Sequence, residues 1–234
     1  MESMREGNFR SQAKRAGVFF SQLSPSALED FRLMEHPSSC AANVVLFTEG
    51  EPGKALVVVL EGEVRLSMNS SDGRRLSLRI ARAGEIIGLS STLSGTPYDI
   101  TAETLYPSKI AVIERHEFLS FLPRHPGAYQ SVTEELGRHM NSACSQLRTL
   151  GLSSSAHEKL ARLLLEWSDG AQTKGSENRL RFSLTHEEIG DFIGTSRETV
   201  SRTLGDFKNH HLVAFHGSMM TIPSREALAD YAHA

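Results

Sequence analysis

The sequence predicts an α+β chain in which a β-roll comes first, a long helix follows, and a small helical domain with a β-hairpin comes last. Three patterns support this order. Short apolar segments separated by glycine run from about residue 44 to residue 113. Apolar residues then recur at helical spacing through residues 126–152. Two short helical patterns and a hairpin pattern occupy residues 184–223.

At 234 residues, the chain is long enough for one or two domains. Its 39% of hydrophobic residues and its net charge of −3 are those of a soluble globular protein that is not basic. We find no apolar run of membrane-spanning length and no signal-peptide pattern, so we expect a cytoplasmic protein without a membrane partner. Affinity for a polyanion would come from a local cluster of basic residues, which are Lys174, Arg179, Arg181, Arg197, Arg202 and Lys208.

The chain carries no pattern that is typical of an enzyme. A nucleophile elbow, a phosphate-binding loop and metal-ligand spacings are all missing, so we expect no catalysis, no metal and no cofactor. The two cysteines, Cys40 and Cys144, form neither a CxxC pair nor a zinc motif. We expect both to be buried as small apolar residues.

The N-terminal part begins with a polar stretch. Residues 1–16 lack apolar periodicity, which predicts a flexible terminus. Phe19 to Met34 then resembles one amphipathic helix with Leu23, Leu28 and Phe31 on its apolar side. A first folded domain is expected over residues 17–125.

Four segments of that domain are typical of strands followed by turns: VVLFTEGEPG, KALVVVLEGEVRLSM, RRLSLRIARAGEIIG and DITAETLYPSKIAVI. Asp72-Gly73 lies between two of these strands and predicts a tight hairpin. Gly50, Gly62 and Gly84 mark further turns, and we interpret them as turn residues rather than ligand-binding residues. Many short strands at regular spacing favour an all-β roll or barrel.

The long helix is predicted over residues 126–152. Leu136, Met140, Ala143, Leu147 and Leu150 follow one another in steps of four, three, four and three, which is a heptad seam. Because the chain offers no second seam of this length, the pattern predicts a parallel homodimer through this helix. The alternative is that the helix packs along the chain's own β-roll. The last domain is expected over residues 153–234, with a core that includes Leu160, Leu163, Leu164 and Trp167.

Local signals in residues 184–223 specify two helices and the turn between them. Thr185 and Glu188 have the spacing of a capping box at the start of the first helix. Gly194 is expected to end that helix in the left-handed conformation. Thr195 or Ser196 can then cap the second helix.

The second helix has an apolar stripe of Val200, Leu204 and Phe207, which is expected to pack on the first helix. The other face presents four polar side chains: Arg197, Glu198, Ser201 and Arg202. Arginine can donate two parallel hydrogen bonds to guanine, and glutamate can accept one from cytosine. Two helices, a tight turn and a hairpin therefore predict a winged helix-turn-helix domain that binds double-stranded DNA. A solvated charged helix face is the alternative.

The run EIGDFIGTSRETVSR closely resembles the signature of the Crp/Fnr superfamily of bacterial transcription regulators. The resemblance implies a cyclic-nucleotide-binding-like jelly roll, a dimerisation helix and a C-terminal winged helix-turn-helix. It places Arg197, Glu198 and Arg202 at the base-reading positions. We expect Ser201 of the outward face and the neighbouring Thr185, Ser196 and Thr199 to be DNA-binding residues as well. Arginine first in the reading triplet resembles the branch that reads TGTGA-like half-sites, whereas Ser201 beside Arg202 resembles the branch that reads TTGAT. The first position separates the branches, so we expect a TGTGA-like inverted repeat.

In the family's cyclic-AMP-binding members, a Gly-Glu pair and an Arg-Ser pair in the roll hold the ribose and the phosphate, and a Thr-Ser pair on the dimer helix holds the adenine. The aligned positions here are Gly88-Leu89 with Ser90 beside them, Tyr98-Asp99, and Ala143-Cys144. Only Gly88 matches. Without the arginine there is no bidentate clamp on the phosphate, and Asp99 would repel it. We therefore expect no cyclic AMP binding in the family's usual mode.

Several forms of control stay open at this point. An iron-sulfur sensor needs a cysteine cluster that the chain lacks, and His139 is the histidine least unlike a haem ligand. The protein could instead be a ligand-binding or redox-sensing module, with DNA binding conditional on Cys144 or on another effector in the roll. A ligand-free regulator controlled by its abundance also fits. Activation or repression depends on operator position and on surface patches that contact RNA polymerase.

Overall fold

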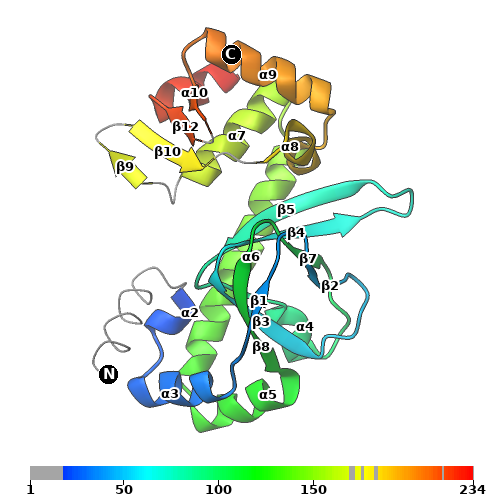
Figure 1. Cartoon of the computed structure of the whole chain (residues 1–234), viewed down its shortest axis with the longest axis vertical. Helices are drawn as coiled ribbons and strands as arrows, with labels where there is room; N and C mark the ends of the chain where they lie inside the picture. Colours follow the sequence, from blue (N-terminus) through cyan, green and yellow to red (C-terminus); the bar gives the residue numbers. More distant parts are fainter. Residues whose placement is uncertain (1–17, 169–171, 175–176, 182–183, 218, 234) are drawn as a thin grey trace. The chain divides into compact units, whose positions relative to one another are not determined.

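The computed structural model describes residues 18–168, 172–174, 177–181, 184–217 and 219–233. The segment 1–16, predicted to be flexible, lies outside these residues. The chain forms two compact units, of which the first ends at Ser142 and the second begins at Ala143. The division falls inside the long helix α6 (Ala128–Gly151), so this one helix contributes to both units (Figure 1). The predicted class, a β-roll followed by a long helix and a helix-turn-helix, is confirmed.

The first unit contains two four-stranded antiparallel sheets. In spatial order, the first sheet consists of β1 (His36–Cys40), β8 (Ser108–Glu114), β3 (Ala55–Glu61) and β6 (Ile86–Ile87). The second consists of β2 (Val45–Phe47), β7 (Thr101–Thr104), β4 (Glu63–Asn69) and β5 (Arg75–Arg82). The predicted Asp72-Gly73 hairpin joins β4 to β5, and Gly73 has a φ of 83° that suits glycine in a tight turn.

Strand β3 shows why the first unit has two apolar cores. Its side chains alternate between the two faces of the sheet, as in any β-strand. Leu56 and Val58 lie in a core shared with helices, whereas Val57 and Val59 lie in a core shared with the second sheet. All four are buried, which explains the continuous apolar run in the sequence.

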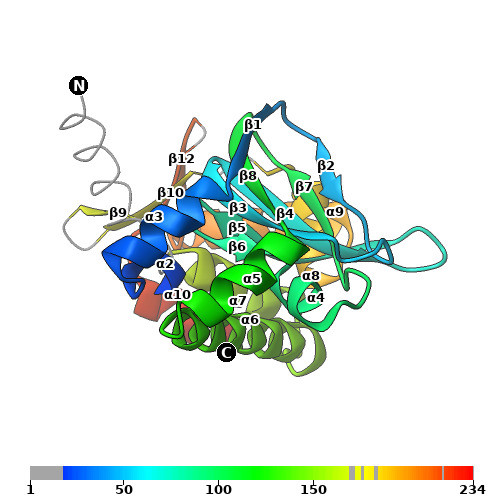
Figure 2. The ribbon, with the colours of Figure 1, turned by 90° about the horizontal axis from the view of Figure 1, so that it is seen from below.

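The helices of the first unit gather on one side of its first sheet (Figure 2). These helices include α2 (Val18–Ser21), α3 (Pro25–Leu33), α5 (Arg115–Arg124) and the first turns of α6. The buried rings of Phe19, Phe31, Phe118 and Phe121 pack together there. The prediction of a single helix from Phe19 to Met34 is wrong. The hydroxyl of Ser24 accepts a hydrogen bond from the Ala27 N–H, and Pro25 occupies the first helical position, so a new helix starts there.

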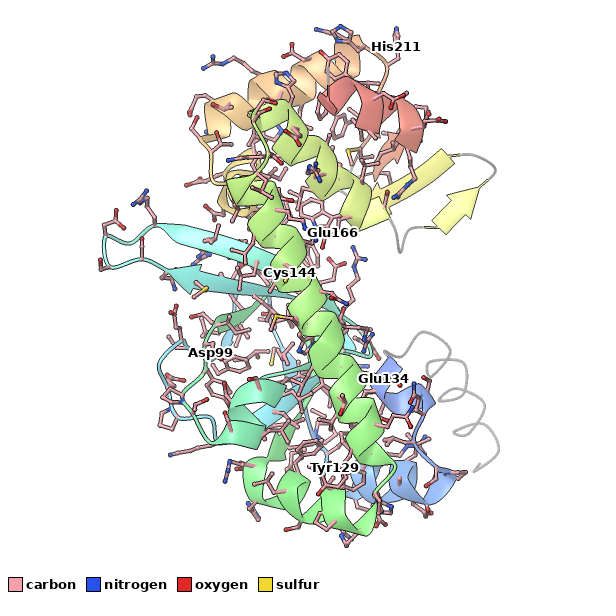
Figure 3. All side chains as sticks on the ribbon, turned by 180° about the vertical axis from the view of Figure 1, so that it is seen from behind. Asp99, Tyr129, Glu134, Cys144, Glu166 and His211 are labelled. Carbon is pink, nitrogen blue, oxygen red and sulfur yellow. The ribbon has the colours of Figure 1, made fainter. Side chains whose placement is uncertain are left out.

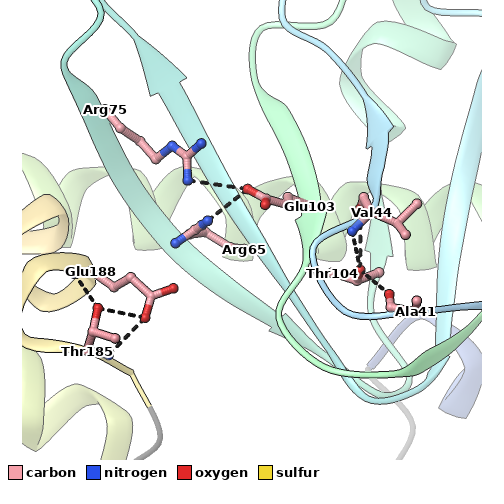
Figure 4. Close-up of polar contacts among 8 residues, drawn as sticks. All are labelled: Ala41, Val44, Arg65, Arg75, Glu103, Thr104, Thr185 and Glu188. Atoms are coloured by element: carbon pink, nitrogen blue, oxygen red, sulfur yellow. Dashed lines mark hydrogen bonds and ion pairs between the residues drawn. The ribbon is translucent and has the colours of Figure 1, made fainter.

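Strand β1 and helices α4 (Leu89–Ser94) and α5 were not predicted. The β1 sequence, HPSSC, has no apolar alternation, and it becomes a strand by pairing with β8 far along the chain. Polar contacts tie the neighbouring loops in place (Figure 4). The hydroxyl of Thr104 donates to the carbonyl of Ala41 at 2.7 Å and accepts from the N–H of Val44 at 2.9 Å.

The second unit contains the last turns of α6, four further helices and one antiparallel sheet in the described part of the chain. Its helices are α7 (Ala156–Ser168), α8 (His186–Ile193), α9 (Arg197–Asn209) and α10 (Arg225–His233). Its strands pair in the order β11 (Ala214–His216), β12 (Met219–Ile222), β10 (Glu177–Arg181) and β9 (Gln172–Lys174). The predicted hairpin is β11–β12, whereas β9, β10 and α10 were not predicted.

The core of the second unit matches the expected apolar residues. Leu160, Leu163 and Leu164 of α7 are buried, and Trp167 is half-buried with its ring edge-on to Phe192 at a centroid distance of 5.2 Å. Buried residues of α8 and α9 complete the core, together with Leu228 of α10. Because Trp167 is the chain's one tryptophan, its fluorescence reports on this unit.

Helix α6 presents an exposed apolar row. Met140 is 65% exposed and Leu147 is 69% exposed, and Ala143 between them is exposed as well. At the two ends of the predicted seam, Leu136 packs against the helix-side core of the first unit, and Leu150 is half-buried. Cys144 lies beside this row on the outer surface of the helix and is exposed. The expectation that both cysteines are buried is therefore wrong. Cys40 is half-buried and packs against the core between the sheets.

Candidate nucleic-acid interface

Helix α8 begins with the predicted capping box (Figure 4). The N–H of Glu188 donates to the Thr185 hydroxyl at 3.2 Å, and the Glu188 carboxylate accepts from the Thr185 N–H at 2.8 Å. The Thr185 hydroxyl also donates to that carboxylate at 3.0 Å. The helix is therefore stabilised at its first turn by residues that are adjacent in sequence.

The turn between α8 and α9 depends on two glycines. Gly194 ends α8 with a φ of 64°, as predicted. Gly190 allows the chain to fold back closely, because a Cβ at that position would lie only 2.5 Å from the carbonyl oxygen of Thr195. The backbone of Thr195 is also bonded to Gly190, because the Thr195 N–H donates to the Gly190 carbonyl oxygen at 3.1 Å.

Two glycine-to-alanine substitutions should have opposite effects on the second unit. Gly190→Ala should lower its free energy of unfolding by about 1–3 kcal/mol, because the methyl group forces the turn open. Gly205→Ala in α9 should raise it by up to about 1 kcal/mol, because nothing lies within 4 Å of the new Cβ and alanine favours helix. Urea unfolding followed by Trp167 fluorescence measures both, and equal midpoints for the two variants would show that the turn relaxes freely.

Helix α9 buries one face and exposes the other. Val200, Leu204 and Phe207 are buried, as the apolar stripe predicts. Arg197, Glu198, Ser201 and Arg202 are all exposed. The hydroxyl of Ser196 accepts from the Thr199 N–H at 3.3 Å and so caps the helix. The chain thus presents two guanidinium groups and a carboxylate on the first two turns of a helix whose other face is buried.

The charge of Glu198 is stabilised locally. A hydrogen bond from its own backbone N–H lowers the pKa of the Glu198 carboxyl, and the Ser196 side chain and the two neighbouring arginines lower it further. Glu198 is therefore an anionic acceptor at neutral pH, as readout of an amino group requires.

Ser201 is less free than its exposure suggests. Its hydroxyl donates to the carbonyl of Arg197 at 3.0 Å, and it lies 2.7 Å from Nδ1 of His186 on α8. Since the serine proton is committed to Arg197, the imidazole is the donor to the serine oxygen. Sequence reasoning missed His186, because this contact joins two helices.

The expected DNA-binding residues therefore divide into two groups. Thr185, Ser196 and Thr199 are engaged in capping the helices, and Ser201 is held by His186 and Arg197. Arg197, Glu198 and Arg202 remain as exposed charged groups suited to base edges. Helix α8 is also anchored to α6, because the amide of Gln146 donates to the Phe192 carbonyl at 2.6 Å in a buried contact.

The expected effector residues of the roll are arranged around an aromatic stack. Gly88 begins α4 with a φ of 76°, and a Cβ there would lie 3.1 Å from the Tyr98 ring. The Tyr98 ring stacks on Phe47 with centroids 4.0 Å apart, and only 7% of Tyr98 is exposed. Its hydroxyl donates to the Ala55 carbonyl at 2.5 Å and accepts from the Ala55 N–H at 3.2 Å. Burial raises the pKa of Tyr98, which keeps this hydroxyl neutral.

The other expected effector residues do not add a binding group to this stack. Leu89 is buried, and Ser90 and Asp99 are exposed (Figure 3). Ala143 and Cys144 belong to the second unit, where both are exposed.

His139 is held within the protein. Its Nε2 lies 3.1 Å from a carboxylate oxygen of Glu135, which is 1% exposed and also pairs with Arg138. Burial lowers the pKa of His139 to about 4, with Arg79 adding to the effect. In the part of the chain that the structure describes, no group of three His, Cys, Asp or Glu side chains could hold a metal ion. None of the described helices is both long and apolar enough to cross a membrane.

Comparisons with known proteins agree with this architecture. Residues 37–125 match the cyclic nucleotide-binding domain family, and residues 158–231 match the Crp-like helix-turn-helix domain family. The chain is 27% identical over 216 residues to a CRP-like cAMP-activated global transcriptional regulator of Mycobacterium tuberculosis, covering 92% of this chain and 96% of that protein. It is 28% identical over 228 residues to the nitrogen fixation regulation protein FixK of Bradyrhizobium diazoefficiens, covering 95% and 94%.

A solved structure shows the same fold. FixK2 from Bradyrhizobium japonicum superposes with a TM-score of 0.76 at 23% identity, over 84% of this chain and 96% of that one. Both domain matches fall on the units that carry the roll and the helix-turn-helix. The order of the two domains, the exposed charged face of α9 and the full-length similarity to transcription regulators lead to one conclusion: the chain belongs to the Crp/Fnr superfamily of DNA-binding transcription regulators.

Proposed function

We propose that this regulator acts as a homodimer on a TGTGA-like inverted repeat, with Arg197, Glu198 and Arg202 reading each half-site. The observation that carries the proposal is the exposed arginine-glutamate-arginine face on the first turns of α9, which the Ser196 cap holds in position. A recognition helix enters the major groove with this end first. Arginine suits guanine, and the anionic Glu198 suits the amino group of cytosine.

The exposed row on α6 supports the dimer. Met140, Ala143 and Leu147 present an apolar stripe with no partner in the described part of the chain. A second copy of the helix in parallel register would cover it by interdigitating these side chains. The Gln146–Phe192 hydrogen bond ties the same helix to α8, so joining two copies of α6 also joins two DNA-binding units. Paired recognition helices roughly 34 Å apart would read two half-sites of one palindrome.

Selection of binding sites from a random DNA pool by the purified full-length protein tests the readout. We expect enrichment of an inverted repeat with TGTGA-like half-sites in the absence of any added effector. Enrichment of TTGAT half-sites would contradict the assigned role of Arg197, and enrichment of single half-sites would contradict the dimer. The selection is repeated at two salt concentrations, because phosphate contacts make affinity fall steeply with salt.

We further propose that cyclic AMP does not control this protein in the family's usual mode, although several relatives are named as cAMP-activated. In sequence, Tyr98 aligns with the clamp arginine of the cyclic-AMP-binding members, and its hydroxyl is already bonded to the Ala55 backbone. The Tyr98 ring packs against Gly88 and Phe47. Because a tyrosine replaces the arginine, this position offers no cationic group to a phosphate. Leu89 is buried where a carboxylate would bind a ribose hydroxyl.

Calorimetric titration of the full-length protein with cyclic AMP should give no saturable heat at micromolar concentrations. Binding at such concentrations that is lost in the Asp99→Ala or Gly88→Val variants would contradict the proposal. The Ser70→Ala variant, altered at the exposed tip of the β4–β5 hairpin, is the matched control for a change in the roll outside the stack.

A further inference from the structure

An open pocket of about 290 Å³ lies entirely within the second unit, and none of its lining residues belongs to α9. Helices α6, α7 and α10 form it, and Glu166 on α7 marks its position (Figure 3). Its polar lining consists of Ser145, Arg148, Thr149, Arg162, Glu166 and Arg225. Three guanidinium groups thus meet one carboxylate in a single pocket, so its lining carries a positive balance.

Two of the guanidinium groups are positioned by the chain itself. Arg162 donates from Nε at 3.1 Å and from Nη2 at 3.0 Å to the same carboxylate oxygen of Glu158. Arg225 donates to the carbonyl of Leu165 at 3.0 Å and to the hydroxyl of Ser168. Because these contacts restrict the side chains, an anion that binds them pays little for ordering them.

The third guanidinium group is uncommitted. Arg148 is exposed, and its guanidinium group makes no hydrogen bond or ion pair with any residue that the structure describes. A guanidinium offers five N–H donors in a planar fork that matches two oxygens of a phosphate. The hydroxyls of Ser145 and Thr149 lie in the same lining and can donate to further oxygens.

We propose that this pocket binds the phosphate group of a small molecule, such as a phosphate monoester or pyrophosphate. A tetrahedral phosphate dianion presents several separate oxygens that match the paired donors of a guanidinium group, and it carries twice the charge of a monoanion such as chloride. The lining also includes the apolar side chain of Leu165, next to which an organic substituent of the ester could lie.

The pocket stays accessible in the proposed dimer, and this point alone rests on the proposed function. At 100° per residue, Ser145 and Thr149 lie roughly 140–180° around α6 from Met140 and Leu147. The pocket therefore faces away from the apolar row. A ligand there would connect the end of α6 to α7 and α10 without competing with a second copy of the chain.

Calorimetric titration of the full-length protein with pyrophosphate and with inorganic phosphate, at constant ionic strength set by chloride, tests the proposal. We expect saturable binding by the wild type and roughly tenfold weaker binding by Arg148→Ala, because a charge-assisted hydrogen-bonding group is lost. The matched control is Arg202→Ala, which removes the same charge from α9 of the same unit. Absence of saturable binding, or an equal loss in both variants, would overturn the proposal.

DNA binding by the same two variants separates this site from the proposed function. Arg148→Ala should retain sequence-specific DNA binding while losing phosphate affinity, and Arg202→Ala should show the reverse. If Arg148→Ala weakens DNA binding as much as it weakens phosphate binding, the pocket holds a backbone phosphate of DNA and the small-molecule proposal is wrong. If neither variant affects DNA binding but Arg148→Ala loses phosphate, the pocket stands and the readout proposal fails.

Discussion

Replacing Arg202 by alanine should weaken binding to the selected operator by about 1–3 kcal/mol in each half-site. Because a dimer carries two copies, the combined loss corresponds to roughly 30-fold to more than 10⁴-fold in affinity. Arg202 is exposed on α9, so its guanidinium group is accessible to a base edge. Competition binding with the operator, with single-base variants of it and with random DNA measures the effect.

The result that identifies base readout is the ratio between the affinity for the operator and the affinity for random DNA. Arg202→Ala should reduce that ratio and relax the preference at one base pair of each half-site. Lys208→Ala, in the last turn of the same helix, removes an equal charge and should weaken both kinds of DNA alike. An unchanged ratio for Arg202→Ala would show that this arginine contacts phosphates rather than bases.

Replacing Leu147 by glutamate should break the proposed dimer without unfolding the chain. Leu147 is 69% exposed in the single chain, so the substitution leaves its folding almost unaffected. In the dimer, two leucines would each lose about 1.5–3 kcal/mol of apolar burial. Two carboxylates would also be brought together in an apolar seam. We expect a monomer in sedimentation equilibrium and a large loss of operator affinity, because the half-sites would then bind independently.

The matched control is Asn141→Glu, which adds the same charge at an exposed position of α6 outside the apolar row. It should leave both the molecular mass in solution and the operator affinity unchanged. Thermal unfolding followed by circular dichroism should give the same midpoint for both variants and the wild type. A dimeric Leu147→Glu protein would show that another surface joins the two copies.

The helix-turn-helix was predictable almost residue by residue, because its signals are local. The capping box of Thr185 and Glu188, the end of α8 at Gly194 and the cap at Ser196 all involve residues within four positions of one another. The break before Pro25 was equally local, since a serine followed by a proline favours a helix start. There the apolar periodicity outweighed the cap signal, and the prediction of one continuous helix was wrong.

What the sequence could not show depends on contacts between distant residues. Strand β1 forms because its backbone pairs with β8, about seventy residues away, and its polar side chains give no sign of this. The bond between His186 and Ser201 joins two helices, and it removes one candidate hydroxyl from the set that is free to read bases. The pocket lined by Arg148, Arg162 and Arg225 is formed by side chains of α6, α7 and α10. Of these helices, α10 has no strong helical pattern in the sequence.

The stack of Tyr98 on Phe47 has a consequence for how the roll responds to its surroundings. A diffusible ligand leaves its site when its concentration falls, and the stability that it confers falls with it. A tyrosine that belongs to the chain has no such dependence, because its local concentration is set by the covalent backbone. The contacts of Tyr98 with Gly88 and Ala55 therefore form when the chain folds, without a bound ligand. Depletion of a metabolite would not remove these contacts, because both partners of each contact belong to the same chain.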